Sequence, residues 1–201
     1  CGTVSSVAGD VLEALPLPAM GIIQPAADAA ARATRSRRIG VMGTSTTVRS
    51  GSFVRRLHEL DPSIEVTAAA CPVLVSLVEN GWIDPRDEVT SAAVRRYLLP
   101  LQEAQVDTVI LGCTHFPLLA PLIRAQLGAD VTLIDSGRET AAACAARLAA
   151  ADALCDPKKA RGRYHFFVSD RPEGFTQVAE TFLGHPVHEE IDMIPPDTLR
   201  L

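Results

Sequence analysis

The chain has 201 residues, with 19 basic and 24 acidic side chains and a net charge of −5 at pH 7. This acidic balance, without a long run of Lys or Arg, argues against a nucleic-acid-binding surface. Hydrophobic residues make up 47% of the chain, and the apolar runs are too short to span a bilayer, so we expect a soluble globular protein with a substantial core.

Short apolar runs alternate with longer amphipathic ones, a pattern typical of an α/β protein with parallel strands. We predict strands over residues 19–23, 39–42, 64–68, 108–111, 131–134 and 164–168. We predict helices over residues 4–15, 25–34, 50–60, 72–79, 87–105, 117–127, 139–153 and 172–183. Ser136 and Glu139 have the spacing of a capping box, which predicts the start of the long Ala-rich helix there.

The chain contains five cysteines, widely spaced, without a Cys-x-x-Cys pair or a secretion signal. This usage favours reduced thiols in the cytoplasm over a disulfide framework or a structural zinc site. We expect Cys71 to pack at a turn, Cys144 to lie in the core and Cys155 to be a surface thiol. The chain opens with Cys1 instead of Met, so we expect either that an N-terminal piece is absent or that processing exposed this residue.

The sharpest local feature is the stretch from Val109 to Leu119, in which a buried strand ends at Gly112 and a helix is predicted from Pro117. In open α/β sheets, ligands bind at the carboxyl ends of strands. Cys113 follows Gly112, where a helix N-terminus would favour the thiolate, and His115 is close enough to act as its proton partner. The alternative interpretation of Cys113 is a small buried hydrophobic residue.

Other positions carry weaker signals. Cys1 and Thr3 stand at the entrance to a predicted helix, as Cys113 does. The turn over residues 43–47, Gly-Thr-Ser-Thr-Thr, follows a strand and could bind an anion, although it matches neither a dinucleotide fingerprint nor a P-loop. Glu79 is either a carboxylate near a helix end or a site residue.

Several of these segments together resemble the cofactor-independent glutamate racemases of the aspartate/glutamate racemase group. The matching stretches read Gly-Val-Met-Gly-Thr at 40–44, Thr-Val-Arg-Ser-Gly at 47–51, Ala-Cys-Pro at 70–72, Leu-Val-Glu-Asn-Gly-Trp at 77–82, Leu-Gly-Cys-Thr-His-Phe-Pro-Leu-Leu at 111–119, Asp-Ser-Gly-Arg-Glu-Thr-Ala at 135–141 and Phe-Leu-Gly-His at 182–185. The resemblance runs in the same order from Cys1 to the tail, and the stretch around Cys113 is highly specific.

The resemblance implies racemisation of glutamate by two thiols, without a cofactor or metal. One cysteine takes the α-proton from one face and the second returns a proton to the other face, which requires two acid/base groups of similar pKa. The implied catalytic residues are Cys1, Cys113, His115 and Glu79, and the implied substrate-binding residues are Thr3, Thr114 and His115. The resemblance further implies a cytoplasmic homodimer that supplies D-glutamate for peptidoglycan synthesis.

The implied fold consists of two flavodoxin-like three-layer domains with parallel sheets and the active site between them. Residues 1–23 and 138–201 would form the N-terminal-type domain, and residues 24–137 the second. The family's opening strand, its Asp-Ser-Gly loop and its Pro-Tyr-Gly segment are not found in the sequence, so we expect an N-terminally incomplete first domain. The family also has Cys-Asn-Thr at its first cysteine, where this chain has Cys1-Gly2-Thr3.

Other functions also fit parts of the sequence. A terminal Cys1-Gly2 is found in hydrolases with an N-terminal nucleophile, but their stacked antiparallel sheets do not fit the alternating pattern seen here. A lipoprotein acylated at Cys1 would need a flexible tether, and a helix is predicted there instead. A non-catalytic amino-acid-binding relative and a racemase that prefers aspartate also remain as alternatives.

Overall fold

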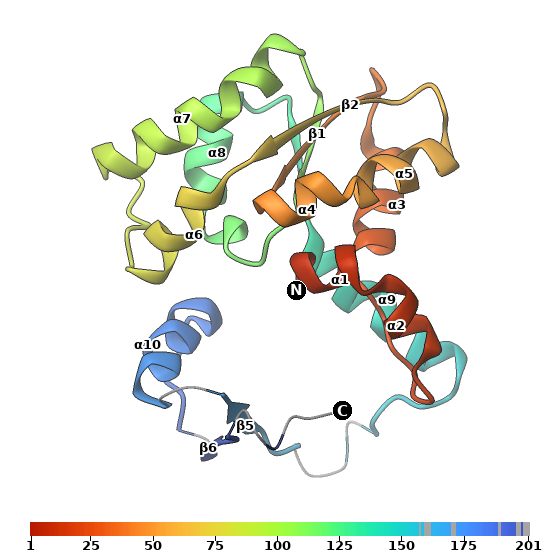
Figure 1. Ribbon diagram of the computed structural model, residues 1–201, viewed down its shortest axis with the longest axis vertical. Helices are drawn as coiled ribbons and strands as arrows, with labels where there is room; N and C mark the ends of the chain where they lie inside the picture. The colour runs from red at the N-terminus through yellow and green to blue at the C-terminus, as the bar shows by residue number, and fades with distance from the viewer. Residues whose placement is uncertain (157, 159–161, 170–171, 189, 196–197, 199–201) are drawn as a thin grey trace. The chain divides into compact units, whose positions relative to one another are not determined.

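The computed structural model describes residues 1–156, 158, 162–169, 172–188, 190–195 and 198 (Figure 1). It contains two compact units, Cys1–Leu154 and Cys155–Leu201. The first unit is built on a four-stranded sheet in the order β2-β1-β3-β4, and every neighbouring pair is parallel. The strands are β1 (Arg38–Gly43), β2 (Glu65–Ala70), β3 (Thr108–Leu111) and β4 (Thr132–Asp135).

The two central strands, β1 and β3, are almost wholly buried, as parallel strands covered on both faces must be. Their register pairs Val41 with Ile110 and Met42 with Leu111, so both strands end at the same edge of the sheet. The order 2-1-3-4 is that of flavodoxin-like sheets, in which chain connections diverge to the two sides of the sheet between β1 and β3. Ligands bind at this switch point, so the fold directs attention to the residues that follow Gly43 and Leu111.

Helices cover both faces of the sheet (Figure 1). On one face lie α3 (Ile23–Ala33) and α5 (Ser52–Leu60), and on the other lie α7 (Glu88–Glu103) and α8 (Ala120–Leu127). The alanines of α3 let it approach the sheet closely, and Ala26, Ala27 and Ala30 are fully buried beside Ile110. The predicted α/β class with a parallel sheet in three layers is therefore confirmed.

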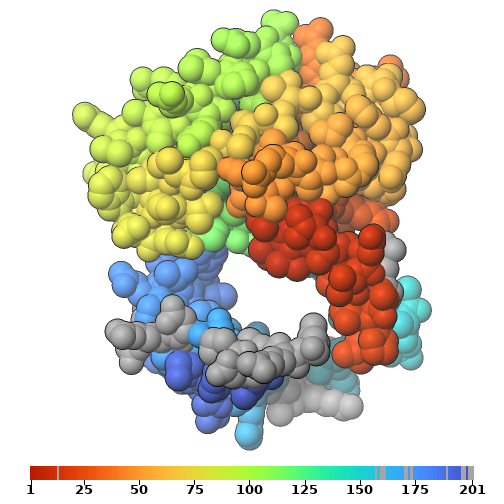
Figure 2. All heavy atoms as spheres, viewed as in Figure 1, coloured from red at the N-terminus to blue at the C-terminus, as the bar shows by residue number. Residues whose placement is uncertain are grey.

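Shorter elements surround the edge at which the strands end. They are α1 (Gly2–Val7), α2 (Gly9–Ala14), α4 (Ser45–Ser50), α6 (Pro72–Glu79), a 3-10 turn η1 (Phe116–Leu119) and α9 (Ser136–Ala150). Helix α1 packs against α4, and in Figure 2 the red N-terminal segment lies directly against the orange segment that includes α4.

Three details of the sequence prediction were wrong. Residues 19–21 form no strand, because this apolar run pairs with no described strand, and α3 begins at Ile23. Two predicted helical stretches contain breaks, one at Ala8 and one at Gly51, whose φ of 65° ends α4. The capping box does not form, because the Asp135 carboxylate caps α9 by accepting from the N–H groups of Gly137 and Arg138.

The second unit contains β5 (His165–Val168), α10 (Pro172–Leu183) and β6 (Glu190–Met193). Strands β5 and β6 pair in parallel, with His165 opposite Glu190, and the Phe166 and Phe175 rings lie 5.5 Å apart. Strand β6 was not predicted, because two acidic residues in four interrupt the apolar pattern. The division into residues 24–137 and residues 1–23 with 138–201 stays a prediction, and part of the latter stretch lies outside the described residues.

Candidate active site

Cys113 stands at the carboxyl end of β3, next to the switch point of the sheet. The Gly112 N–H donates to the Met42 carbonyl oxygen at 2.8 Å, which continues the β1–β3 pairing by one residue. A Cβ atom on Gly112 would lie 2.8 Å from that oxygen and 3.0 Å from the Phe53 ring, so the turn requires glycine. The Cys113 carbonyl then accepts from the Phe116 N–H at 3.1 Å, and the chain enters η1.

The surroundings of the Cys113 thiol favour its protonated form. Only 8% of the residue is exposed, and this burial raises the pKa of the thiol above its ordinary value. Hydrogen bonds from the backbone N–H of His115 and from the Thr114 side chain act in the opposite direction, but they do not outweigh burial. A four-residue 3-10 turn follows Cys113 where the sequence predicted the start of a helix, and burial opposes the thiolate expected there.

His115 links Cys113 to Glu79. Its Nε2 atom lies 3.0 Å from Glu79 Oε1, at the C-terminal end of α6, and its Nδ1 atom lies 3.6 Å from Cys113 Sγ. An ionised carboxylate only accepts, so Nε2 carries a proton and Nδ1 of a neutral ring is left as an acceptor. The arrangement of thiol, imidazole and carboxylate has the geometry in which a base activates a buried nucleophile.

Thr114 and Glu79 are more accessible than the ring between them. The Thr114 hydroxyl lies 3.3 Å from His115 Nδ1 and is exposed. The side chain of Glu79 is 50% exposed, whereas that of His115 is 17% exposed. The structure thus brings four of the predicted residues together: Glu79, Cys113, Thr114 and His115.

Helix α1 places Cys1 at the same edge of the sheet. Gly2 is buried, and a Cβ atom on it would overlap the carbonyl oxygen of Gly112, so the backbones of residues 2 and 112 are in direct contact. Cys1 is exposed and precedes α1 as its N-cap residue. The two cysteines that the sequence singles out are therefore each one residue from a shared backbone contact.

Hydroxyl groups hold α1 in this position. Thr3 Oγ1 lies 2.9 Å from Thr44 Oγ1, which in turn lies 3.0 Å from Thr47 Oγ1 and accepts from the Thr47 N–H as the N-cap of α4. At the other end of α1, Ser52 Oγ donates to the Ser6 carbonyl oxygen at 2.9 Å. The sequence marked Thr44 and Thr47 only as part of a possible anion-binding turn, and the bond from Thr44 to α1 was not predicted. The detectable signal was their place directly after β1, the strand that neighbours β3.

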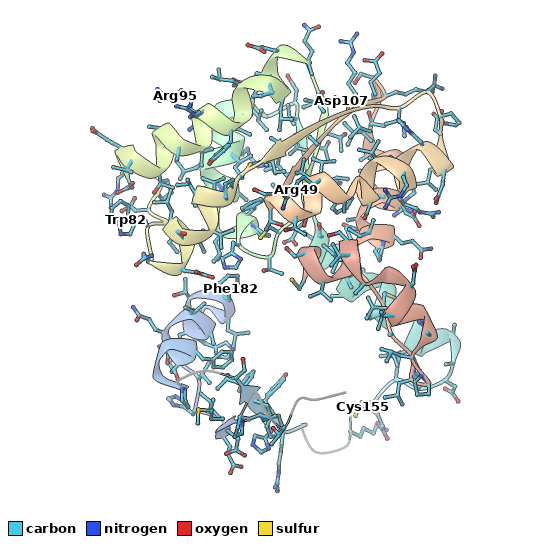
Figure 3. All side chains as sticks on the ribbon, in the orientation of Figure 1. Arg49, Trp82, Arg95, Asp107, Cys155 and Phe182 are labelled. Atoms are coloured by element: carbon cyan, nitrogen blue, oxygen red, sulfur yellow. The ribbon has the colours of Figure 1, made fainter. Side chains whose placement is uncertain are left out.

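Of the remaining cysteines, Cys71 and Cys155 lie as predicted, whereas Cys144, predicted to lie in the core, is only half-buried. Cys71 is fully buried, its thiol donates to the Ala69 carbonyl oxygen at 3.3 Å, and burial raises its pKa to about 12. Cys144 is half-buried and its Sγ atom lies 3.5 Å from Met20 Sδ. Cys155 is exposed (Figure 3). Of the three, Cys71 lies close enough to Cys113 for a Cys113 thiolate to raise its pKa further.

In the part of the chain that the structure describes, one group of side chains could hold a metal ion: His165, Glu190 and Asp192 in the second unit. All three are exposed, and His165 Nε2 already lies 2.9 Å from Asp192 Oδ2. Among the same described residues, no helix is both long enough and apolar enough to cross a membrane.

Comparisons with known proteins identify the family. A family model described as Asp/Glu/Hydantoin racemase matches residues 1–144. The glutamate racemase of Geobacter metallireducens is 44% identical over 185 residues, which cover 92% of this chain and 67% of that protein. The glutamate racemase of Neisseria meningitidis serogroup A is 40% identical over 196 residues, covering 96% of this chain and 71% of that protein.

Solved structures agree with this result. The chain resembles a glutamate racemase isoform from Bacillus anthracis, with a TM-score of 0.89 and 36% identity, over 98% of this chain and 72% of that one. It also resembles the glutamate racemase of Francisella tularensis in complex with D-glutamate, with a TM-score of 0.87 and 26% identity, over the same shares, 98% and 72%. The site at the β1–β3 switch point, the family model and these relatives agree, and the chain belongs to the Asp/Glu racemase family.

Proposed function

We propose that the protein interconverts L- and D-glutamate by proton transfer to and from two cysteines, without a cofactor. The observation that carries the proposal is the backbone contact between Gly2 and Gly112, which brings the segments of Cys1 and Cys113 together at the β1–β3 switch point. The relatives named glutamate racemase, one of them with D-glutamate bound, support glutamate as the substrate.

In the proposed reaction, one sulfur, as thiolate, forms an S–H bond with the α-proton of glutamate. The electron pair of the broken C–H bond is left on the α-carbon and its carboxylate. The other sulfur, as thiol, then gives its proton to the opposite face of the α-carbon, so the enantiomer is inverted and the two cysteines have exchanged protonation states. Atoms and charge balance without an oxidant or a reductant.

Because burial raises the pKa of the Cys113 thiol, the proposal assigns an accessory base to its deprotonation. His115 Nδ1, 3.6 Å from Cys113 Sγ, accepts the thiol proton, and Glu79 fixes the ring with Nε2 protonated and stabilises the resulting imidazolium. In the proposal, the exposed hydroxyl of Thr114 and the half-buried hydroxyl of Thr3 donate to the substrate carboxylates. Fixed donors of this kind stabilise the developing negative charge when water is excluded.

The proposal also includes the setting of the enzyme. The five cysteines are free thiols, as in proteins of a reducing cytoplasm. We place the protein there as a homodimer that supplies D-glutamate for peptidoglycan synthesis, on the basis of its resemblance to the family. Light scattering of the purified protein measures the oligomeric state directly.

The test is to incubate the purified 201-residue chain with L-glutamate, D-glutamate and the two aspartate enantiomers in D₂O. We expect the optical activity of both glutamate solutions to decay to zero, with deuterium appearing at the α-carbon. Faster deuterium exchange into aspartate than into glutamate would mean that aspartate, and not glutamate, is the preferred substrate. Saturable binding of glutamate without any exchange would show a binding protein and would refute the enzymatic function.

A further inference from the structure

Gly2 and Gly112 are in direct backbone contact at the start of α1. Gly2 is the first residue of α1 and lies against the carbonyl oxygen of Gly112, at a separation that leaves no room for a Cβ atom. Gly112 is itself in contact with the Met42 carbonyl oxygen through its N–H. Gly2 and Gly112 thus bring three backbone segments into direct contact: the start of α1, the end of β3 and the end of β1.

This close approach involves α1 as a whole. Thr3 Oγ1 is hydrogen-bonded to Thr44, Ser5 Oγ accepts from the Ile22 N–H at 3.1 Å, and the Ser6 carbonyl accepts from Ser52. Each of these bonds fixes α1 from a different element, and the Gly2 contact fixes its beginning, where Cys1 is attached. Cys113, by contrast, is held by the sheet and by η1, independently of α1.

We infer that Gly2 is a positioning residue whose lack of a side chain sets the approach of Cys1 to Cys113. The inference rests on the proposed two-thiol function. Any side chain at residue 2 forces the start of α1, and Cys1 with it, away from the end of β3.

The size of the effect follows from the demands of proton transfer. Displacing a reacting group by about 1 Å costs an enzyme about a hundredfold in rate. Gly2→Ala adds one methyl group that overlaps a backbone oxygen of the central sheet, and this oxygen cannot move without disturbing β3. We therefore expect the rate of racemisation to fall by about tenfold to a hundredfold in Gly2→Ala, and by at least as much in Gly2→Asn.

The chain offers a matched control in Gly9, the first residue of α2. A Cβ atom at Gly9 meets nothing within 4 Å, so Gly9→Ala adds the same methyl group at the same helical position without a clash. We expect Gly9→Ala to racemise glutamate at the parental rate. Thermal unfolding followed by circular dichroism shows whether each variant retains the fold.

A second readout separates positioning from a structural role. Because only Cys1 moves, deuterium exchange in Gly2→Ala slows more from one enantiomer of glutamate than from the other, whereas partial unfolding slows both equally. If Gly2→Ala does not fold, Thr44→Val tests the same idea, since it removes the Thr3–Thr44 bond that holds α1. It should produce the same difference between enantiomers.

The outcomes are distinct. Parental rates in both Gly2 variants, or equal slowing from both enantiomers in a folded variant, overturn the positioning role and leave the proposed function intact. Absence of exchange in the parent chain overturns the proposed function and the positioning role with it. Slowing that is unequal between the enantiomers, together with an unaffected Gly9→Ala, supports the inference.

Discussion

Replacing Glu79 by glutamine measures how strongly the carboxylate assists His115. The pair is 3.0 Å apart, but half of the Glu79 side chain is exposed, and water screens such a pair. Exposed ion pairs contribute about 0.2–1 kcal/mol. A loss of about 1 kcal/mol in the transition state slows a reaction about fivefold. We therefore expect kcat in Glu79→Gln to fall by about twofold to fivefold, far less than the roughly 10⁴-fold loss known for a buried aspartate–histidine pair.

The assay is the initial rate of glutamate racemisation at saturating substrate, with Glu59→Gln as control. Glu59 also forms an ion pair, with Arg56 at 3.3 Å, and its side chain is 63% exposed, but it lies on α5 away from the site. The initial rate of racemisation by Glu59→Gln should equal that of the parent protein. In a His115→Gln background, Glu79→Gln should have no further effect. A thousandfold loss in Glu79→Gln alone would refute this reasoning, because it would make the carboxylate a proton carrier in its own right.

Three further predictions concern stability. Asp107, labelled in Figure 3, accepts from Thr34 Oγ1 at 2.6 Å and from the N–H groups of Arg35 and Ser36 at 2.7 and 2.6 Å. Burial works to raise the pKa of its carboxyl group, but these bonds outweigh it and hold the pKa below its ordinary value. Asp107→Asn should lower the free energy of unfolding by about 2 kcal/mol at pH 7. The deficit should shrink in urea unfolding at pH 3, since a lowered pKa stabilises the fold above about pH 4 and less as pH falls. Cys71 has a pKa of about 12 in the fold against an ordinary value of 9.0, so the parent should lose about 1.4 kcal/mol of stability per pH unit above pH 9. Urea unfolding at pH 8 and pH 10.5 should show a smaller loss in Cys71→Ala, and equal losses would contradict the assignment. Gly51→Ala should lower the melting temperature by an amount equivalent to about 1 kcal/mol, because the φ of 65° disfavours a residue with a Cβ atom. An unchanged melting temperature would mean that the turn relaxes.

Much of the fold could be read from periodicity. The strand over 108–111 and the helices over 72–79 and 172–183 were predicted with the bounds that the structure has. Continuous apolar runs between amphipathic stretches are typical of a parallel sheet covered on both faces by helices. Residues 19–23 show the limit of this reasoning, because an apolar run forms a strand only where a neighbouring strand accepts its hydrogen bonds, and local sequence does not contain that information.

The sequence predicted which residues form the site better than it predicted their chemical properties. Cys113 and His115 share a short motif, whereas Glu79 and Cys1 carried weaker local signals and took their catalytic roles from the family resemblance. The raised pKa of Cys113 could not be read from the motif, because it depends on the burial of the thiol in the folded chain. The contact between Gly2 and Gly112 joins residues 110 positions apart, and no local pattern marks it.

The most direct test of the two-thiol mechanism compares Cys1→Ala with Cys113→Ala in D₂O, starting separately from L- and D-glutamate. We predict that neither variant racemises glutamate, that each loses α-proton exchange from one enantiomer, and that the enantiomer lost differs between the two variants. Exchange at the parental rate from both enantiomers in either variant, or loss of the same enantiomer in both, would contradict the assignment of the two sulfurs to opposite faces of the substrate.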